Sequence, residues 1–98
     1  MIHLVVTAND ALYERITNRL KAENIRATNA LDGFRLASRT TVDQIIVDLN
    51  LYAADTLVET LRSRPETAHL AVHLIKGNGT IPLPLRQLCE QVWEAHDL

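Results

Sequence analysis

Apolar and polar residues alternate along the first three quarters of the chain in two rhythms. Four short runs rich in Ile, Val and Leu are typical of strands buried on both faces; they lie at residues 2–6, 25–28, 44–49 and 71–75. Between them, apolar residues recur at helical spacing. The predicted helices follow Asn9 and Asp10, cover residues 34–39 after a turn at Asp32 and Gly33, and cover residues 55–63 ahead of Pro65. Strands alternating with helices predict βαβ units and a parallel sheet.

The last quarter of the chain has a different pattern. Two glycines flank Asn78 and predict a loop over residues 76–80. A rudimentary fifth strand is expected at residues 80–83, followed by a last helix. The apolar residues of that helix have the spacing of a half-buried stripe; they are Leu85, Leu88, Cys89, Val92 and Trp93. With right-handed crossovers, helices cover both faces of the sheet, so the predicted fold class is a doubly wound, flavodoxin-like α/β sandwich.

Composition agrees with one folded domain over residues 1–98. The hydrophobic share is 47% and the charged share 22%, which is ordinary for a globular domain. No apolar run approaches the roughly 20 residues that cross a bilayer, and the basic residues form no cluster. Neither a membrane span nor direct nucleic-acid binding is therefore expected. The chain has one cysteine, Cys89, which excludes an intrachain disulfide and favours a cytoplasmic location.

Three segments carry a resemblance to a known family. Residues 42–49, with the sequence VDQIIVDL, resemble the third strand of response-regulator receiver domains, which ends in the phospho-accepting aspartate. Residues 61–72 are similar to the receiver segment that joins the third helix to the fourth strand, and residues 29–33 to a recurring strand end with an Asp-Gly pair. The resemblance runs from Ile2 to Ile75. It implies a CheY-like parallel sheet of four to five strands in the order 2-1-3-4-5, with Asp48 as the candidate phospho-acceptor.

The chain departs from the receiver pattern at the family's switch site. Receivers carry an acidic pair after the first strand that holds Mg²⁺, and the matching residues here are Thr7 and Ala8. Lys76 matches the Ser or Thr that ends the fourth strand. Ile81 and Pro82 stand where receivers have Lys and Pro after the fifth strand.

Two further departures lie outside that site. Tyr52 replaces a proline that follows the acceptor, and it is a candidate interface anchor. The segment between Ile75 and Pro82 is too short for the family's fourth helix, so that helix is expected to be missing or reduced.

These departures leave alternatives for the acidic residues. Asp48 is either a slow phospho-acceptor or an inherited acid, and Lys76 either pairs with Asp48 or points into solvent. Asp10 is expected to cap the first helix, the alternative being that it replaces a lost metal ligand. No cofactor is expected beyond weak Mg²⁺ binding, because Asp48 is the only retained acid of the site.

The remaining chemistry-bearing residues indicate no enzyme. The four histidines, His3, His69, His73 and His96, have no metal-ligand spacing. Cys89 lies on an apolar stripe and is expected to be a buried thiol. Trp93 is expected either in the core or at an interface.

The expected function is that of a pseudo-receiver, a signalling module that acts by protein–protein interaction without phosphorylation. Its partner would be a signalling protein or a histidine kinase, with a homodimer as a further form, and docking is expected along Leu83, Leu85, Cys89 and Trp93. The alternative is a true receiver of a two-component system, phosphorylated on Asp48 with atypical Mg²⁺ use. A third hypothesis is an unrelated small ligand on the same fold.

Overall fold

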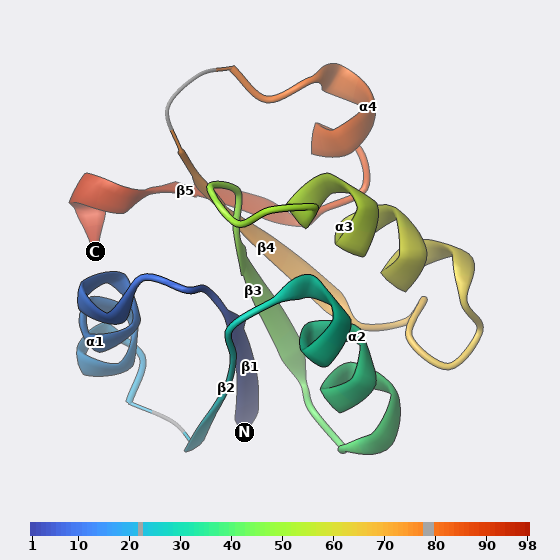
Figure 1. Cartoon of the computed structure of the whole chain (residues 1–98), viewed down its shortest axis with the longest axis horizontal. Helices are drawn as coiled ribbons and strands as arrows, with labels where there is room; N and C mark the ends of the chain where they lie inside the picture. Colours follow the sequence, from blue (N-terminus) through green and yellow to red (C-terminus); the bar gives the residue numbers. More distant parts are fainter. Residues whose placement is uncertain (22, 78–79) are drawn as a thin grey trace.

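Five parallel strands form a single sheet in the order β2-β1-β3-β4-β5, as Figure 1 shows. The computed structural model describes residues 1–21, 23–77 and 80–98. The strands are β1 (Ile2–Val6), β2 (Glu23–Ala27), β3 (Gln44–Asp48), β4 (Ala71–Lys76) and β5 (Gln91–Glu94). The predicted fold class and strand order are confirmed.

Helices cover both faces of this sheet. They are α1 (Asp10–Arg19), α2 (Ala30–Arg39), α3 (Ala54–Ser63) and the one-turn α4 (Leu83–Arg86), and a 3₁₀ turn, η1 (Ala95–Asp97), follows β5. Helices α2 and α3 lie side by side on one face, and α1 lies apart from them (Figure 1). None of the helices in the described parts of the chain has the length and apolar character needed to span a bilayer.

The core has two parts because successive strand residues point to opposite faces. Leu4 and Val6 of β1 join the larger cluster under α2 and α3, whereas Val5 joins the smaller cluster under α1. All three are completely buried. The continuous apolar runs of the sequence thus reflect a sheet whose two faces are both covered by helices.

Asparagine side chains fix where α1 and α2 begin. The Asn9 Oδ1 accepts the Leu12 amide hydrogen at 3.1 Å, and the Asn29 Oδ1 accepts that of Asp32 at 2.8 Å. Helix α2 therefore starts at Ala30, and the turn predicted at Asp32 and Gly33 is wrong. Gly33 lies inside the helix, where a Cβ would come within 3.1 Å of the Val6 methyl groups.

The last quarter of the chain differs most from expectation. The strand predicted at residues 80–83 and the helix predicted through Trp93 are wrong, because β5 is formed by Gln91–Glu94. The fourth helix is present but reduced to four residues after Pro82. Of the glycine loop predicted at residues 76–80, Lys76 belongs to β4, and residues 78 and 79 lie outside the described residues.

The side chain of Arg62 joins α3 to the segments that flank β4. Its Nε donates to the Leu88 carbonyl at 2.6 Å, and its Nη1 donates to the carbonyls of Ala68 and Leu70 at 2.9 and 2.8 Å. Its Nη2 lies 2.6 Å from Glu90 Oε1. Burial acts to raise the pKa of Glu90, but the Val72 amide and the Arg62 guanidinium outweigh it and hold that pKa below its ordinary value of 4.5.

Candidate functional site

Asp48 lies at the carboxyl end of β3, where the strand order places β1 and β4 on either side of it. Its carboxylate is 4% exposed. The Thr7 hydroxyl donates to Oδ2 at 2.7 Å, and the Asn50 amide donates to Oδ1 at 3.0 Å. The Thr7 oxygen in turn accepts the Asn9 amide hydrogen at 3.1 Å. Both carboxylate oxygens are thus already engaged by the protein.

A glycine closes this site on the β4 side. A Cβ at Gly77 would overlap the side-chain amide of Asn50, so the backbone after β4 lies directly against that amide. A side chain at position 77 would force the Asn50 amide to move. Sequence reasoning singled out neither Asn50 nor Gly77, although the glycine was a visible signal.

The residues around Asp48 do not fit a magnesium site of the kind that the resemblance implies. Thr7 and Ala8 supply no carboxylate where an acidic pair would stand, and Mg²⁺ in proteins is usually held by one or two carboxylates. The alternative ligand, Asp10, is the first residue of α1 and lies 2.7 Å from the Arg26 guanidinium; the expectation that it caps the helix is wrong, because Asn9 is the capping residue. Among the residues that the structure describes, no group of three His, Cys, Asp or Glu side chains is suited to a metal ion.

Lys76 is the last residue of β4 rather than the first of the predicted loop, and of the two alternatives for its side chain the pairing with Asp48 is not found. Its Nζ lies 3.5 Å from Glu94 Oε1 on β5. The reason is the alternation of side chains: Lys76 shares a face with Val72 and Leu74, whereas Asp48 shares the opposite face with Ile46.

Ile81 does not follow the fifth strand, because that strand lies at residues 91–94 and not at the predicted residues 80–83. It precedes α4 and packs against the larger core cluster. Strand β5 ends at Glu94, and the residues that follow it are Ala95 and His96. Neither residue is the lysine that the resemblance places after the fifth strand.

The residues predicted as a docking surface do not share one surface. Leu83 is 66% exposed, whereas Leu85 and Cys89 are buried in the cluster under α2 and α3. Trp93 packs on the other face of the sheet against the smaller cluster. The prediction assumed one helix, and the strand at Gln91–Glu94 separates these side chains instead. The buried position expected for Cys89 is confirmed.

An apolar hollow lies beside the Asp48 site. It has a volume of about 620 Å³, and its walls include Ala8, Leu31, Asn50 and Tyr52. The Tyr52 side chain is 93% exposed. A narrower groove of about 210 Å³ continues from it between α2 and α3, sharing Leu31.

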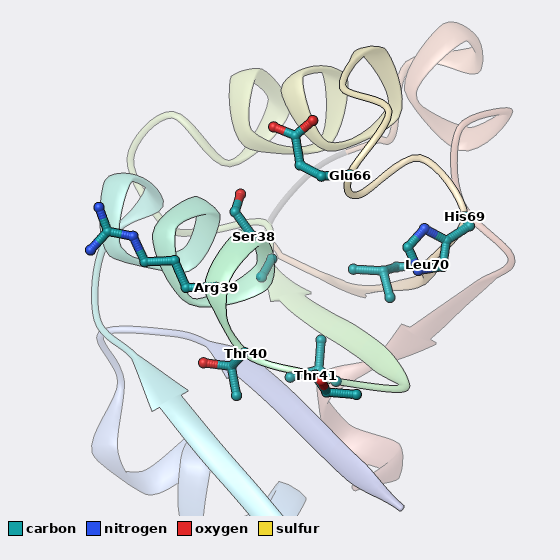
Figure 2. Close-up of a pocket in the computed structure, with 9 residues that line it drawn as sticks. Ser38, Arg39, Thr40, Thr41, Glu66, His69 and Leu70 are labelled. Carbon is teal, nitrogen blue, oxygen red and sulfur yellow. The ribbon is translucent and has the colours of Figure 1, made fainter.

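A separate hollow, of about 230 Å³, lies at the other end of the strands, between the segments that lead into β3 and β4 (Figure 2). Its walls include Thr41, Glu66 and His69, and Figure 2 shows the Arg39 guanidinium turned away from them. Its position separates it from the chemistry at Asp48.

Replacing Thr7 with valine should lower the free energy of unfolding by about 1–3 kcal/mol, because a buried carboxylate loses one of its donors. Chemical denaturation in urea measures the change. Thr17→Val is the matched control, since the Thr17 hydroxyl donates to the Glu14 carbonyl at an exposed position; its effect should stay within about 0.5 kcal/mol. Equal effects of the two substitutions would show that the Thr7–Asp48 contact does not stabilise the site.

Comparison with known proteins places this geometry in a structural class. No family model matches the sequence, and no curated protein matches it. Solved structures match over nearly the whole chain. A CheY-like receiver domain from Methylobacillus flagellatus has 20% identity and a TM-score of 0.84, with 96% of this chain and 85% of that chain covered. A putative response regulator from Chloroflexus aurantiacus has 19% identity and a TM-score of 0.84, with 98% and 88% covered.

A third structure is informative because of its bound ion. It is the receiver domain of a sensor histidine kinase from Pseudomonas aeruginosa, with magnesium coordinated in its active-site cleft. It has 15% identity and a TM-score of 0.78, with 95% of this chain and 83% of that chain covered. The fold of the present chain is therefore that of CheY-like response-regulator receiver domains.

Proposed function

We propose that this protein is a receiver-like signalling module that works by binding another protein, without phosphorylation of Asp48. The observation that carries the proposal is the state of the Asp48 carboxylate. It is buried, both of its oxygens accept hydrogen bonds, and no second carboxylate stands at Thr7 or Ala8. Attack on a phosphoryl group needs a free carboxylate and a cation that neutralises the charge.

The charges at the ends of β4 and β5 support the same proposal. The resemblance implies a hydroxyl at the end of the fourth strand and a lysine after the fifth, whereas this chain has Lys76 at the end of β4 and Ala95 after β5. Lys76 pairs with Glu94 of β5 at 3.5 Å, on the face of the sheet opposite Asp48. The pair instead favours one fixed arrangement of β4 and β5.

The surface proposed for the partner lies on the apolar hollow beside Asp48. Tyr52 and Leu31 are exposed there, and large exposed apolar side chains are frequent anchors of protein interfaces. This replaces the docking surface expected along Leu83–Trp93. The partner is proposed to be a signalling protein of a two-component system, by analogy with the receiver domain of the sensor histidine kinase.

A titration with Mg²⁺ and then beryllofluoride, followed by ¹⁵N-HSQC NMR, tests the proposal. The native chain should show no saturable shifts around Asp48 at millimolar Mg²⁺, because the site lacks a second carboxylate. The double variant Thr7→Asp/Ala8→Asp restores the acidic pair and should gain Mg²⁺-dependent shifts.

Asp48→Ala is the matched control for that titration. Shifts in the native chain that disappear in Asp48→Ala would refute the proposal and support the second candidate function, a receiver that accepts phosphate on Asp48. That candidate is favoured by one observation, the position of Asp48 at the carboxyl end of β3 between β1 and β4.

A further inference from the structure

Two buried histidines and one glutamine form a polar row on the α1 side of the sheet. His3 of β1 is 4% exposed and His73 of β4 is 7% exposed. Gln44 of β3 lies between them: its Nε2 is 2.5 Å from His3 Nε2, and its Oε1 is 2.5 Å from His73 Nε2. Three neighbouring strands are thereby joined by side chains as well as by their backbones.

The row continues to the edge strand through a ring stack. The Trp93 ring of β5 lies parallel to the His73 ring, with 5.1 Å between centroids and 9° between planes. On the other face of the sheet, Lys76 pairs with Glu94. Strand β5 pairs with β4 alone, and Val92 and Trp93 also pack against the core clusters to which β4 contributes.

One amide cannot serve two protonated histidines. It offers one NH₂ donor and one carbonyl acceptor, so one histidine must accept and the other donate, whichever way the amide is turned. In the described orientation His3 accepts and His73 donates. A second proton on the accepting ring would set an N–H group against the NH₂ of Gln44 and break the bridge.

The site at which His73 would take up a proton is also unfavourable. His73 already donates through Nε2, so a proton must go to Nδ1. That atom is buried, and the described residues offer it no hydrogen-bond partner. A buried N–H group that carries positive charge and lacks an acceptor is costly. Water can provide the acceptor only when a neighbouring element moves, and β5 is the element held by the fewest strand pairings.

We propose that the His3–Gln44–His73 row is a proton-sensitive contact. It holds Trp93 and β5 against β4 when both histidines are neutral, and it releases β5 when His73 is protonated. This inference does not depend on whether Asp48 is phosphorylated. The charged groups around the row come from several elements. They are the amino terminus and Asp43 near His3, Glu90 with its partner Arg62 near His73, and Arg19 and Asp97 beside Trp93.

The balance of these groups favours the neutral form. Burial lowers the pKa of His73 from its ordinary value of 6.5, Glu90 partly offsets this, and His3 lowers it further. Burial and the amino terminus lower the pKa of His3, against smaller opposite effects of Asp43 and Asn24. The two histidines titrate near pH 6.5 in the form with β5 released, and below pH 6.5 in the form with the row intact. The released form therefore binds more protons between these two pKa values, and the contact of β5 with β4 weakens as the pH falls below 6.5.

Hydrogen exchange of single amides, with Trp93 fluorescence as a second readout, tests this proposal. Trp93 is the only tryptophan, so the emission reports on the stack directly. Between about pH 7.5 and pH 5.5, protection of the Val92, Trp93 and Glu94 amides, corrected for intrinsic exchange, should fall severalfold, because the released form binds more protons over that interval. The β3 amides should keep their protection, which separates local release from global unfolding.

Three variants sharpen the result. His73→Phe keeps a ring against Trp93 but cannot take a proton, so its β5 protection should not depend on pH. His69→Gln and His96→Gln remove exposed histidines near β4 and β5 and should behave like the native chain. If His73→Phe does not fold, NMR titration of His73 in the native chain replaces it. A His73 pKa at or above 6.5, β5 protection that is constant with pH, or an unchanged pH response in His73→Phe would each overturn the proposal.

Discussion

Replacing Arg62 with alanine should lower the free energy of unfolding by about 1–3 kcal/mol, because several part-buried carbonyls lose a charged hydrogen-bond donor. The guanidinium satisfies three backbone carbonyls and one carboxylate, and its side chain is only 20% exposed. Alanine would leave the carbonyls of Ala68, Leu70 and Leu88 without this donor, and Glu90 without its cation. Urea denaturation followed by circular dichroism measures the loss.

Two further variants separate the causes of that loss. Arg62→Lys keeps the charge but not the planar fork, so it should recover only a part of the stability. Arg64→Ala is the matched control, because the Arg64 guanidinium contacts the Phe34 ring at 5.9 Å. Its effect should be below about 1 kcal/mol. A loss in Arg64→Ala as large as that in Arg62→Ala would show that the network around Arg62 contributes nothing specific.

The second large effect is expected at Leu61. This residue is completely buried in α3 within the larger core cluster. Leu61→Ala should cost about 2–5 kcal/mol, because it removes apolar contacts and leaves a cavity that rigid neighbours fill only in part. That is a large share of the roughly 5–15 kcal/mol that stabilises a typical domain.

Leu31→Ala provides the comparison for Leu61, since the same atoms are removed from α2 at a position that is 60% exposed. Its cost should stay within about 0.5 kcal/mol. Thermal unfolding of both variants at one pH gives the two values side by side. Similar losses would mean that Leu31 is covered in solution, which an interface between copies of the chain at the apolar hollow would explain.

The fold was predictable from sequence where local patterns and tertiary packing agree. The short apolar runs around Val5, Ile46 and Leu74 indicate strands. Each is a strand in the structure, with limits within two residues of those expected. Helix α2 shows where such prediction ends. Gly33 is a turn signal in sequence, but it lies inside the helix, where a Cβ would come within 3.1 Å of Val6 and 3.3 Å of Leu57.

The end of the chain was mispredicted for a related reason. Residues 85–93 match a helical stripe, yet a short buried run with Val92 and Trp93 equally suits a strand. These residues form a strand because the edge of β4 offers backbone groups for β5 to pair with. No local sequence pattern contains that information.

The Asp48 site was predictable in part. The acid, Thr7 and Ala8 were identified by position, and Thr7 does lie against Asp48. The partner of Lys76 was not predictable, because Glu94 becomes its neighbour only once β5 is placed correctly. The histidine row was missed because His3, Gln44 and His73 are far apart in sequence and meet only across three strands.

The uniformly parallel pairing of the five strands also bears on how the chain folds. A parallel pair cannot close through a tight hairpin, so each pairing must wait for a crossover to form. Strand β3 meets β1 across about 40 intervening residues. Contacts at such separations incur loop-closure entropy before they yield stabilisation, and chains dominated by them fold more slowly than helical bundles of equal length. Folding is thus expected to be limited by the meeting of β1 and β3, with the short edge strand β5 joining last.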